Sequence, residues 1–138
     1  MICVIRISGD VKLDGKVRDT LGRLRLRKKY ACVVIDPKAE EEGMIKKVRD
    51  FVAYGKISNN VFEKLIEKRG QKVDKKKAVD AKKTAEELAK GKRYEDLNLK
   101  PFFRLHPPRG GINSKVHFPK GVLGDNGEKI DDIVLRML

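Results

Sequence analysis

The chain has 138 residues, the usual size of one domain, and 40% of them are hydrophobic, enough to form a core. Its 33 lysines and arginines outnumber 20 aspartates and glutamates, which gives a formal net charge of +13. This composition argues against wholesale disorder and indicates a polyanionic partner, either a nucleic acid or an anionic membrane surface.

The N-terminal part of the chain is predicted to form a strand, a helix and a second strand. Residues 1–8 are apolar and rich in β-branched side chains, a pattern typical of a strand. Asp14 is a suitable N-cap for a helix that ends within residues 23–26, because apolar residues follow it at helical spacing. Residues 30–35 are nearly all apolar, which indicates a strand that is covered on both faces.

A second helix and a third strand complete the compact part of the chain. Residues 39–50 are expected to be helical, with three glutamates in the first turn, where the helix dipole favours them. The apolar face of this helix is predicted to consist of Met44, Ile45, Val48 and Phe51. Residues 51–57 indicate a third strand. This order predicts an α+β fold with helices packed on one face of a small sheet, in which a right-handed crossover would make the first two strands parallel.

Beyond residue 57 the pattern changes to short helices and loops. Ser58 or Asn60 can cap a helix that Gly70 ends, and residues 84–87 (TAEE) have the sequence of a capping box that opens a further helix. Residues 101–105 (PFFRL) are expected to add a strand to an edge of the sheet. The C-terminus is predicted to be a helix whose apolar face is formed by Ile130, Ile133, Val134 and Met137.

The lysine-dense stretch 71–83 is interpreted either as a solvated loop or as a loop that becomes ordered on contact with RNA. We expect residues 1–138 to form a single domain, with 1–57 as a compact core and 58–138 as a helical and loop extension.

The two cysteines and the N-terminus carry no sign of secretion or of metal binding. Cys3 and Cys32 lie in apolar strand-like runs and are expected to be buried free thiols. No apolar stretch approaches the roughly 18 residues that a membrane span requires, and the N-terminal run is too short for a signal peptide. We therefore expect a soluble cytoplasmic protein without a metal, a cofactor, a membrane partner or a small-molecule substrate.

Three stretches carry a specific resemblance: EGMIKKVRDFVAYG at 42–55, NNVFEKLIEKRG at 59–70 and RLHPPRGG at 104–111. In this order they resemble the archaeal and eukaryotic branch of the ribosomal protein L-thirty family, whose eukaryotic members are called L-seven. RLHPPRGG followed by KVHFPKG is most similar to the archaeal form. The resemblance implies a ferredoxin-like α+β core and a structural, non-catalytic role in the large ribosomal subunit. It also implies large-subunit rRNA and neighbouring ribosomal proteins as partners, with 5S rRNA as a candidate contact.

Two basic clusters on the compact part are candidates for RNA binding. The first lies at the end of the first predicted helix and consists of Arg23, Arg25, Arg27, Lys28 and Lys29. Its alternative interpretation is a solvated helix end, where cations are favourable. The second lies on the second predicted helix and consists of Gly43, Lys46, Lys47 and Arg49. The resemblance implies that this helix contacts RNA, while the alternative is that its cations are solvated or pair with Glu42 or Asp50.

A third cluster lies in residues 97–124, which contain no acidic residue. It consists of Arg104, His106, Arg109, Gly110, Gly111, Lys115, His117 and Lys120. The adjacent glycines allow a close approach of the backbone to phosphate, and their amides can form an anion-binding nest. An ordinary surface turn is the alternative interpretation.

Two other classes of protein compete with this interpretation. One is a non-ribosomal RNA-processing or RNA-modifying protein that uses His106 and His117, although no nearby acid or cysteine completes such a site. The other is an architectural DNA-binding protein. Aromatic residues make up only 6% of the chain, and Phe62, Phe102 and Phe103 are predicted to belong to the core. The sequence therefore favours recognition of RNA backbone and shape over the reading of single strands.

Overall fold

A five-stranded sheet forms the centre of the structure, which is a computed structural model. The described residues are 2–7, 14–35, 39–70, 81–90, 94, 102–106 and 123–137. In chain order the elements are β1 (Ile2–Arg6), α1 (Gly15–Arg23), β2 (Ala31–Ile35), α2 (Ala39–Lys47), β3 (Val52–Lys56), α3 (Asn59–Arg69), α4 (Ala81–Ala89), β4 (Phe103–Arg104), β5 (Gly124–Asp125), a 3₁₀ turn (Gly127–Lys129) and α5 (Ile130–Met137).

The strands are arranged in the order β4-β2-β1-β3-β5, and β1 is antiparallel to both β2 and β3. The prediction that the first two strands are parallel is therefore wrong. The chain leaves β1 and enters β2 at the same end of the sheet, where the Tyr30 N–H donates to the Arg6 carbonyl at 2.7 Å. The connection through α1 therefore brings the chain back to the end of the sheet where β1 finished. The crossover between two parallel strands is made instead by α2, which connects β2 to β3.

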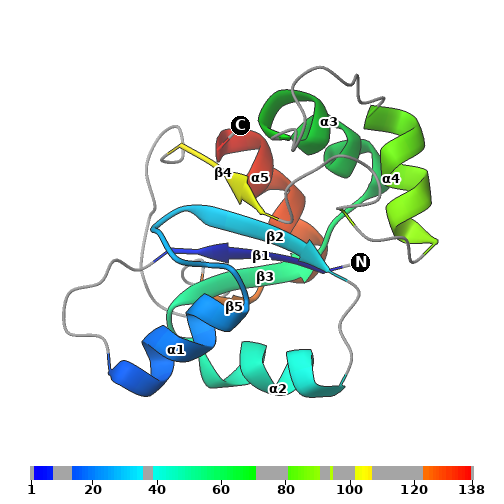
Figure 1. The fold of residues 1–138 in the computed structure, drawn as a ribbon. Helices are drawn as coiled ribbons and strands as arrows, with labels where there is room; N and C mark the ends of the chain where they lie inside the picture. The colour runs from blue at the N-terminus through cyan, green and yellow to red at the C-terminus, as the bar shows by residue number, and fades with distance from the viewer. Residues whose placement is uncertain are drawn as a thin grey trace.

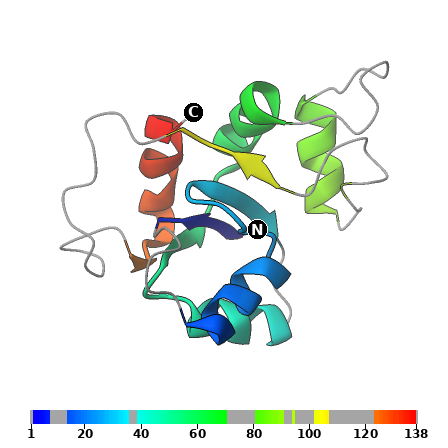
Figure 2. The ribbon, with the colours of Figure 1, turned by 60° about the vertical axis from the view of Figure 1, so that its left-hand side comes forward.

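Helices cover both faces of the sheet (Figures 1 and 2). The two helices of the compact part, α1 and α2, lie on one face, as predicted. The helices of the extension, α3, α4 and α5, lie together on the opposite face, which the sequence had not assigned to them. The prediction of a doubly covered strand is confirmed for β2, where Ala31 and Val33 are buried against one set of helices and Cys32 and Val34 against the other.

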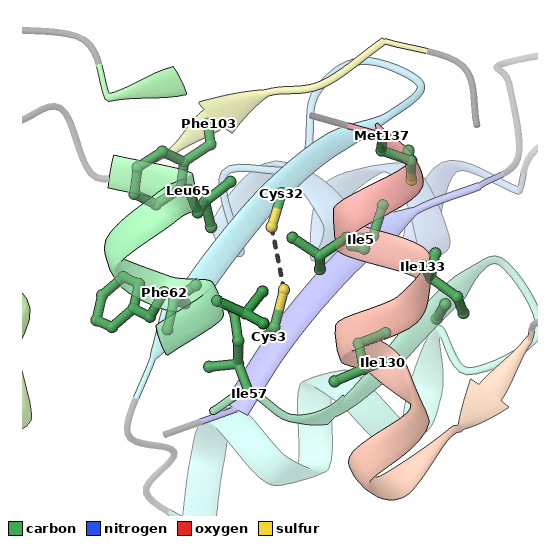
Figure 3. Close-up of a cluster of buried hydrophobic side chains, with 14 of the residues drawn as sticks. Cys3, Ile5, Cys32, Ile57, Phe62, Leu65, Phe103, Ile130, Ile133 and Met137 are labelled. Atoms are coloured by element: carbon green, nitrogen blue, oxygen red, sulfur yellow. Dashed lines mark hydrogen bonds between the residues drawn. The ribbon is translucent and has the colours of Figure 1, made fainter. Parts of the chain in front are cut away.

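The smaller core lies between the sheet and α1 and α2. Its buried residues are Val4, Leu21, Leu24, Leu26, Ala31, Val33, Ile45, Val48 and Val52. The larger core lies on the opposite face, between the sheet and the extension helices (Figure 3). Its centre includes Phe62 and Leu65 from α3, Phe103 from β4, and Ile130 and Met137 from α5. The predicted apolar face of the C-terminal helix is confirmed, because all four of its members are buried.

The two cysteines are free and buried in the larger core, as predicted. Their sulfur atoms lie 3.2 Å apart, between α3 and α5 (Figure 3). The pKa of the Cys3 thiol is raised well above its usual value, first by the hydrogen bond with Cys32 and then by burial. Tyr94 packs against this core. Its ring contacts the Phe103 ring edge-on, with 6.2 Å between the ring centres, and its hydroxyl donates a hydrogen bond to the Val34 carbonyl.

The helix boundaries confirm most of the sequence predictions and correct two. Asp14 and Ser58 are N-caps whose side chains accept from Lys16 and Val61, and the edge strand predicted over 101–105 is present as β4. The capping box at 84–87 is wrong, because α4 begins three residues before Thr84, which is buried inside the helix. As a result, residues 81–83 belong to a helix and not to the predicted loop, whose other residues lie outside the described part of the chain.

Gly55 is required where β3 meets the turn before α5. A β-carbon at this position would lie 2.2 Å from the backbone oxygen of Gly127, so the two backbones approach more closely than any side chain allows.

Where the structure describes the chain, each helix is too short or too polar to cross a membrane.

Candidate nucleic-acid interface

Described members of all three basic clusters lie at one end of the sheet. At this end β1 terminates and β2 and β3 begin, as shown by hydrogen bonds from Tyr30 N to Arg6 O and from Ile7 N to Phe51 O. In Figure 1 it is the end toward which the β1 arrow points. We call this surface the basic end, and its members are Arg23, Arg25, Arg27, Lys28, Lys29, Lys46, Lys47, Arg49 and Arg104, all exposed.

The segment between α1 and β2 turns its leucines inward and its cations outward. Leu24 and Leu26 are buried in the smaller core, so the intervening Arg25 is directed to the surface. The Leu26 N–H donates to the Leu21 carbonyl at 2.8 Å, and the Leu26 carbonyl accepts from the buried Arg6 guanidinium at 3.1 Å. Residues 23–26 are predicted as the end of the first helix, and α1 does end at Arg23; the segment that follows is an anchored loop that displays cations.

Two residues of this segment hold a left-handed backbone conformation. Arg25 has φ 64° and Tyr30 has φ 65°, whereas the residues that usually adopt such values are Gly and Asn. A left-handed residue with a β-carbon costs about 1–2 kcal/mol, and strain of this kind is concentrated at functional sites. The loop therefore keeps its cations in place at the expense of local stability.

The cations of α2 belong to its last turn and to the turn that follows. Lys46, Lys47 and Arg49 are exposed, while Ile45 and Val48 beside them are buried. The helix ends at Lys47, earlier than predicted, so Arg49 lies in the turn before β3. Gly43 is exposed in the middle of α2, and an added β-carbon would meet nothing within 4 Å among the described residues. The fold itself therefore does not require a glycine there.

The third cluster is described only at its start. Arg104 lies on the edge strand β4, paired with Ala31 of β2, and is exposed. His106 is half-buried, and its backbone N–H donates to the Met137 carbonyl at the end of α5, at 3.2 Å. The remaining predicted members, Arg109, Gly110, Gly111, Lys115, His117 and Lys120, lie outside the described residues.

A cavity of about 500 Å³ lies between the α1–β2 segment and β4. Its described lining residues are Arg25, Arg27, Lys28, Lys29, Ala31, Phe102, Arg104 and Leu105. The lining thus combines five cations with apolar groups, and none of the described lining residues is acidic. A second hollow, of about 410 Å³, shares Arg27 and is also lined by Arg6, Arg18 and Gly22.

Sequence reasoning assigned no binding role to six described lining residues, of which Phe102, Arg6 and Arg18 carry an aromatic ring or a charge. Phe62 and Phe103 are fully buried, as predicted. Phe102, also predicted as core, packs half-buried against the smaller core, and it lines the larger hollow as well. The period of two along a strand could have found it, because burial of Phe103 directs residues 102 and 104 to the opposite face. Arg6 and Arg18 carried no signal, since one interrupts an apolar strand and the other lies on an ordinary helix surface.

No described group of three or more histidine, cysteine, aspartate or glutamate side chains is arranged to hold a metal ion. His106 lies beside the end of α5, and its suggested partner His117 is outside the described part of the chain. The chemistry that the described basic end offers is therefore charge, planar guanidinium groups and half-buried aromatic rings, among them Tyr30 and Phe102.

Comparison with known proteins adds independent information. The family model for ribosomal protein L30p/L7e matches residues 2–52. The large ribosomal subunit protein uL30 of Archaeoglobus fulgidus is 42% identical over 151 aligned positions, which cover 99% of each chain. The proteins of the same name from Methanococcus vannielii and Nanoarchaeum equitans are each 37% identical and cover 98% and 100% of this chain, and 97% and 99% of their own lengths.

Proposed function

This chain belongs to the ribosomal protein L30p/L7e family and is a structural protein of the large ribosomal subunit, where we propose that its basic end binds folded rRNA. The convergence of cations from three separate segments at one end of the sheet is the observation that supports this role. Arg25, Lys46 and Arg104 come from different parts of the chain, and the topology brings these parts together.

The chemistry of the basic end suits RNA backbone more than base edges. Double-stranded RNA hides its base edges in a deep, narrow groove and presents phosphates and 2′-hydroxyls. Arginine can bind a phosphate with two parallel hydrogen bonds, while lysine supplies a compact charge. Both types occur along residues 23–29, so the segment can follow a phosphate backbone without reading its sequence.

We propose further that the protein acts without catalysis. The backbone N–H of His106 donates to the end of α5 where β4 meets that helix, and this bond does not require the imidazole. A His106→Ala variant should therefore leave ribosomal RNA processing unchanged in cells. A loss of processing in otherwise intact particles would favour the RNA-processing alternative.

The proposed binding surface can be tested with two matched triple variants. The first replaces Arg25, Arg27 and Lys28 with glutamine, and the second makes the same replacement at the exposed Lys64, Lys68 and Lys83 of α3 and α4. Each lowers the formal net charge by three, from +13 to +10. Co-sedimentation with large subunits is measured for both variants over a series of salt concentrations.

The first variant should be released at lower salt, and its log–log salt dependence of binding should weaken by about one for each phosphate that it no longer neutralises. The second should behave like the unmodified protein. Equal effects of the two variants would show that only total charge matters. Recovery of the native protein wholly in the ribosome-free fraction would contradict the ribosomal role itself.

A further inference from the structure

The cavity between the α1–β2 segment and β4 has a lining that plain phosphate binding does not need. Four of its cations come from residues 25–29, and a fifth, Arg104, comes from β4. Phosphate binding requires only such cations at a surface. Here they surround a hollow of about 500 Å³, whose wall also contains Phe102, Leu105 and Ala31. This volume lies in the range of small-ligand sites, roughly 300–1,000 Å³.

Phe102 and Arg104 contact each other in this wall, with the Arg104 guanidinium over the Phe102 ring. They lie on the same face of the β4 segment, because Phe103 between them is buried in the larger core. The Arg104 guanidinium carbon is 5.8 Å from the centre of the Phe102 ring. Guanidinium planes and aromatic rings are the two groups on which proteins stack unpaired RNA bases.

The cavity is held in shape by backbone contacts on both sides. The Leu105 N–H donates to the Tyr30 carbonyl at 3.2 Å and thereby ties β4 to the start of β2. Arg6 fixes the other wall through its bond to the Leu26 carbonyl, and Arg25 and Tyr30 hold left-handed conformations at either end of the loop. A site formed in advance loses little conformational entropy when it is filled.

We propose that this cavity receives one unpaired nucleotide of the bound RNA, with its base against Phe102 and Arg104 and its phosphate on the cations of residues 25–29. This inference rests on the proposed rRNA binding and adds a recognised feature to it, namely a base extruded from a helix or loop. A continuous duplex would satisfy the cations but would place no base against the exposed part of Phe102, whose other side packs on the smaller core. An acidic peptide would pair with the cations, but its carboxylates offer no extended ring system to stack against Phe102.

The probe for this site is a short RNA hairpin with a single-nucleotide bulge, compared with the same hairpin without the bulge. Dissociation constants are measured by fluorescence anisotropy at one fixed salt concentration. The full chain is used as the wild type and as two variants. Phe102→Leu removes the aromatic ring but keeps apolar bulk, and Arg104→Lys removes the planar guanidinium but keeps the charge. Phe51→Leu is the matched control, because Phe51 is also half-buried against the smaller core but is absent from the cavity lining.

We expect the wild type to prefer the bulged hairpin, and Phe102→Leu to weaken its binding roughly 5- to 100-fold, as loss of one stacked base does. Arg104→Lys should weaken it in the same direction. Binding of the unbulged hairpin should change less than about twofold in both variants, and Phe51→Leu should bind both hairpins like the wild type. Equal binding of the two hairpins by the wild type, or parallel losses for both hairpins, would overturn the proposal.

A measurement on the wild type alone keeps the test independent of how the variants fold. The bulged base is replaced by 2-aminopurine, and quenching of its fluorescence by acrylamide is compared between free and bound hairpin. Protection in the complex supports an enclosed base, while unchanged quenching overturns the proposal. Failure of these tests with intact ribosome co-sedimentation would leave the proposed rRNA binding standing, so the two ideas fail separately.

Discussion

The two faces of the sheet use the same strands but differ in what they support. Among the described residues, the face under α3, α4 and α5 buries 19 residues in its core, and the face under α1 and α2 buries 9. The second face also borders the left-handed Arg25 and the exposed glycine of α2. This difference indicates that the larger core supplies most of the stability, so that the protein can tolerate the strain of Arg25 at the basic end.

The largest expected change in the free energy of unfolding comes from a substitution in the larger core. Phe62 is 2% exposed in the larger core, so Phe62→Ala should lower the free energy of unfolding by about 3–5 kcal/mol in urea titrations. Leu135→Ala on α5, at a position that is 40% exposed, should change it by less than about 0.5 kcal/mol. We also propose that both faces unfold together as one domain, so each variant should show a single transition. A decrease below about 1 kcal/mol for Phe62→Ala would remove the asymmetry between the faces.

High pH should destabilise the larger core because the buried Cys3 thiol and the largely buried Tyr94 hydroxyl would lose their protons. The pKa values of Cys3 and Tyr94 are raised in the folded protein, by the Cys32 hydrogen bond and burial for the thiol and by burial for the phenol. The folded state then retains protons that the unfolded state releases, so stability falls as pH rises above about 9, by up to about 1.4 kcal/mol per pH unit for each group. Urea midpoints between about pH 8 and pH 11 measure this fall, and a flat profile over that range would contradict it.

Tyr94→Phe separates the two contributions to the alkaline fall. It removes one titrating group, so the decline above about pH 10 should become shallower. It also removes the hydrogen bond to Val34, at a cost of about 1 kcal/mol at neutral pH. An unchanged slope in this variant would show that the tyrosine does not contribute.

At the basic end, the free energy of unfolding and the proposed affinity for RNA should change in opposite directions. Arg25→Gly relieves a left-handed residue and should raise the free energy of unfolding by about 0.5–1 kcal/mol, while RNA affinity falls because a cation is removed. Arg25→Ala retains the strain and should bind RNA less tightly without becoming more stable. If both variants bind RNA like the wild type, the strained loop has no part in recognition.

The smallest effect is expected at the exposed glycine of α2. Gly43→Ala should stabilise the helix by about 0.5–1 kcal/mol, because alanine is the better helix former and nothing described lies within 4 Å of the new carbon. If an RNA backbone approaches the helix here, affinity should fall at the same time. Gly15→Ala, at the start of α1 and equally open, is the control that should leave affinity unchanged. Unaltered affinity in Gly43→Ala would place the RNA away from this part of α2.

Local pattern was a reliable guide to the elements but not to their arrangement. Apolar spacing and capping residues correctly indicated α1, α3 and α5, because these features act within a few residues of one another. The direction of β2 was wrong, since the crossover rule applies only when a helix crosses the sheet and α1 does not. Thr84 was misread because a capping-box sequence also fits inside a helix whose apolar face is buried.

The sequence identified most cations of the candidate site but not the surface on which they meet. The cations of 23–29 and of α2 were identifiable from their spacing around buried leucines and isoleucine. Their meeting with Arg104 depends on β4 joining the edge beside β2, a pairing between distant segments that no local pattern encodes. Phe102 was assigned to the core, against which it packs, but its place in the cavity wall depends on the same long-range pairing.

Crosslinking within intact large subunits, mapped on both peptide and RNA, would show directly whether the basic end faces rRNA. We expect the crosslinked peptides to come from residues 23–29, 46–49 and 102–106, and the RNA side of the same map shows whether 5S rRNA is among the contacts. The exposed lysines of α3 and α4 should yield few crosslinks to RNA. A map dominated by Lys64, Lys68 and Lys83, with the basic end unmodified, would contradict the proposed orientation of the protein on rRNA.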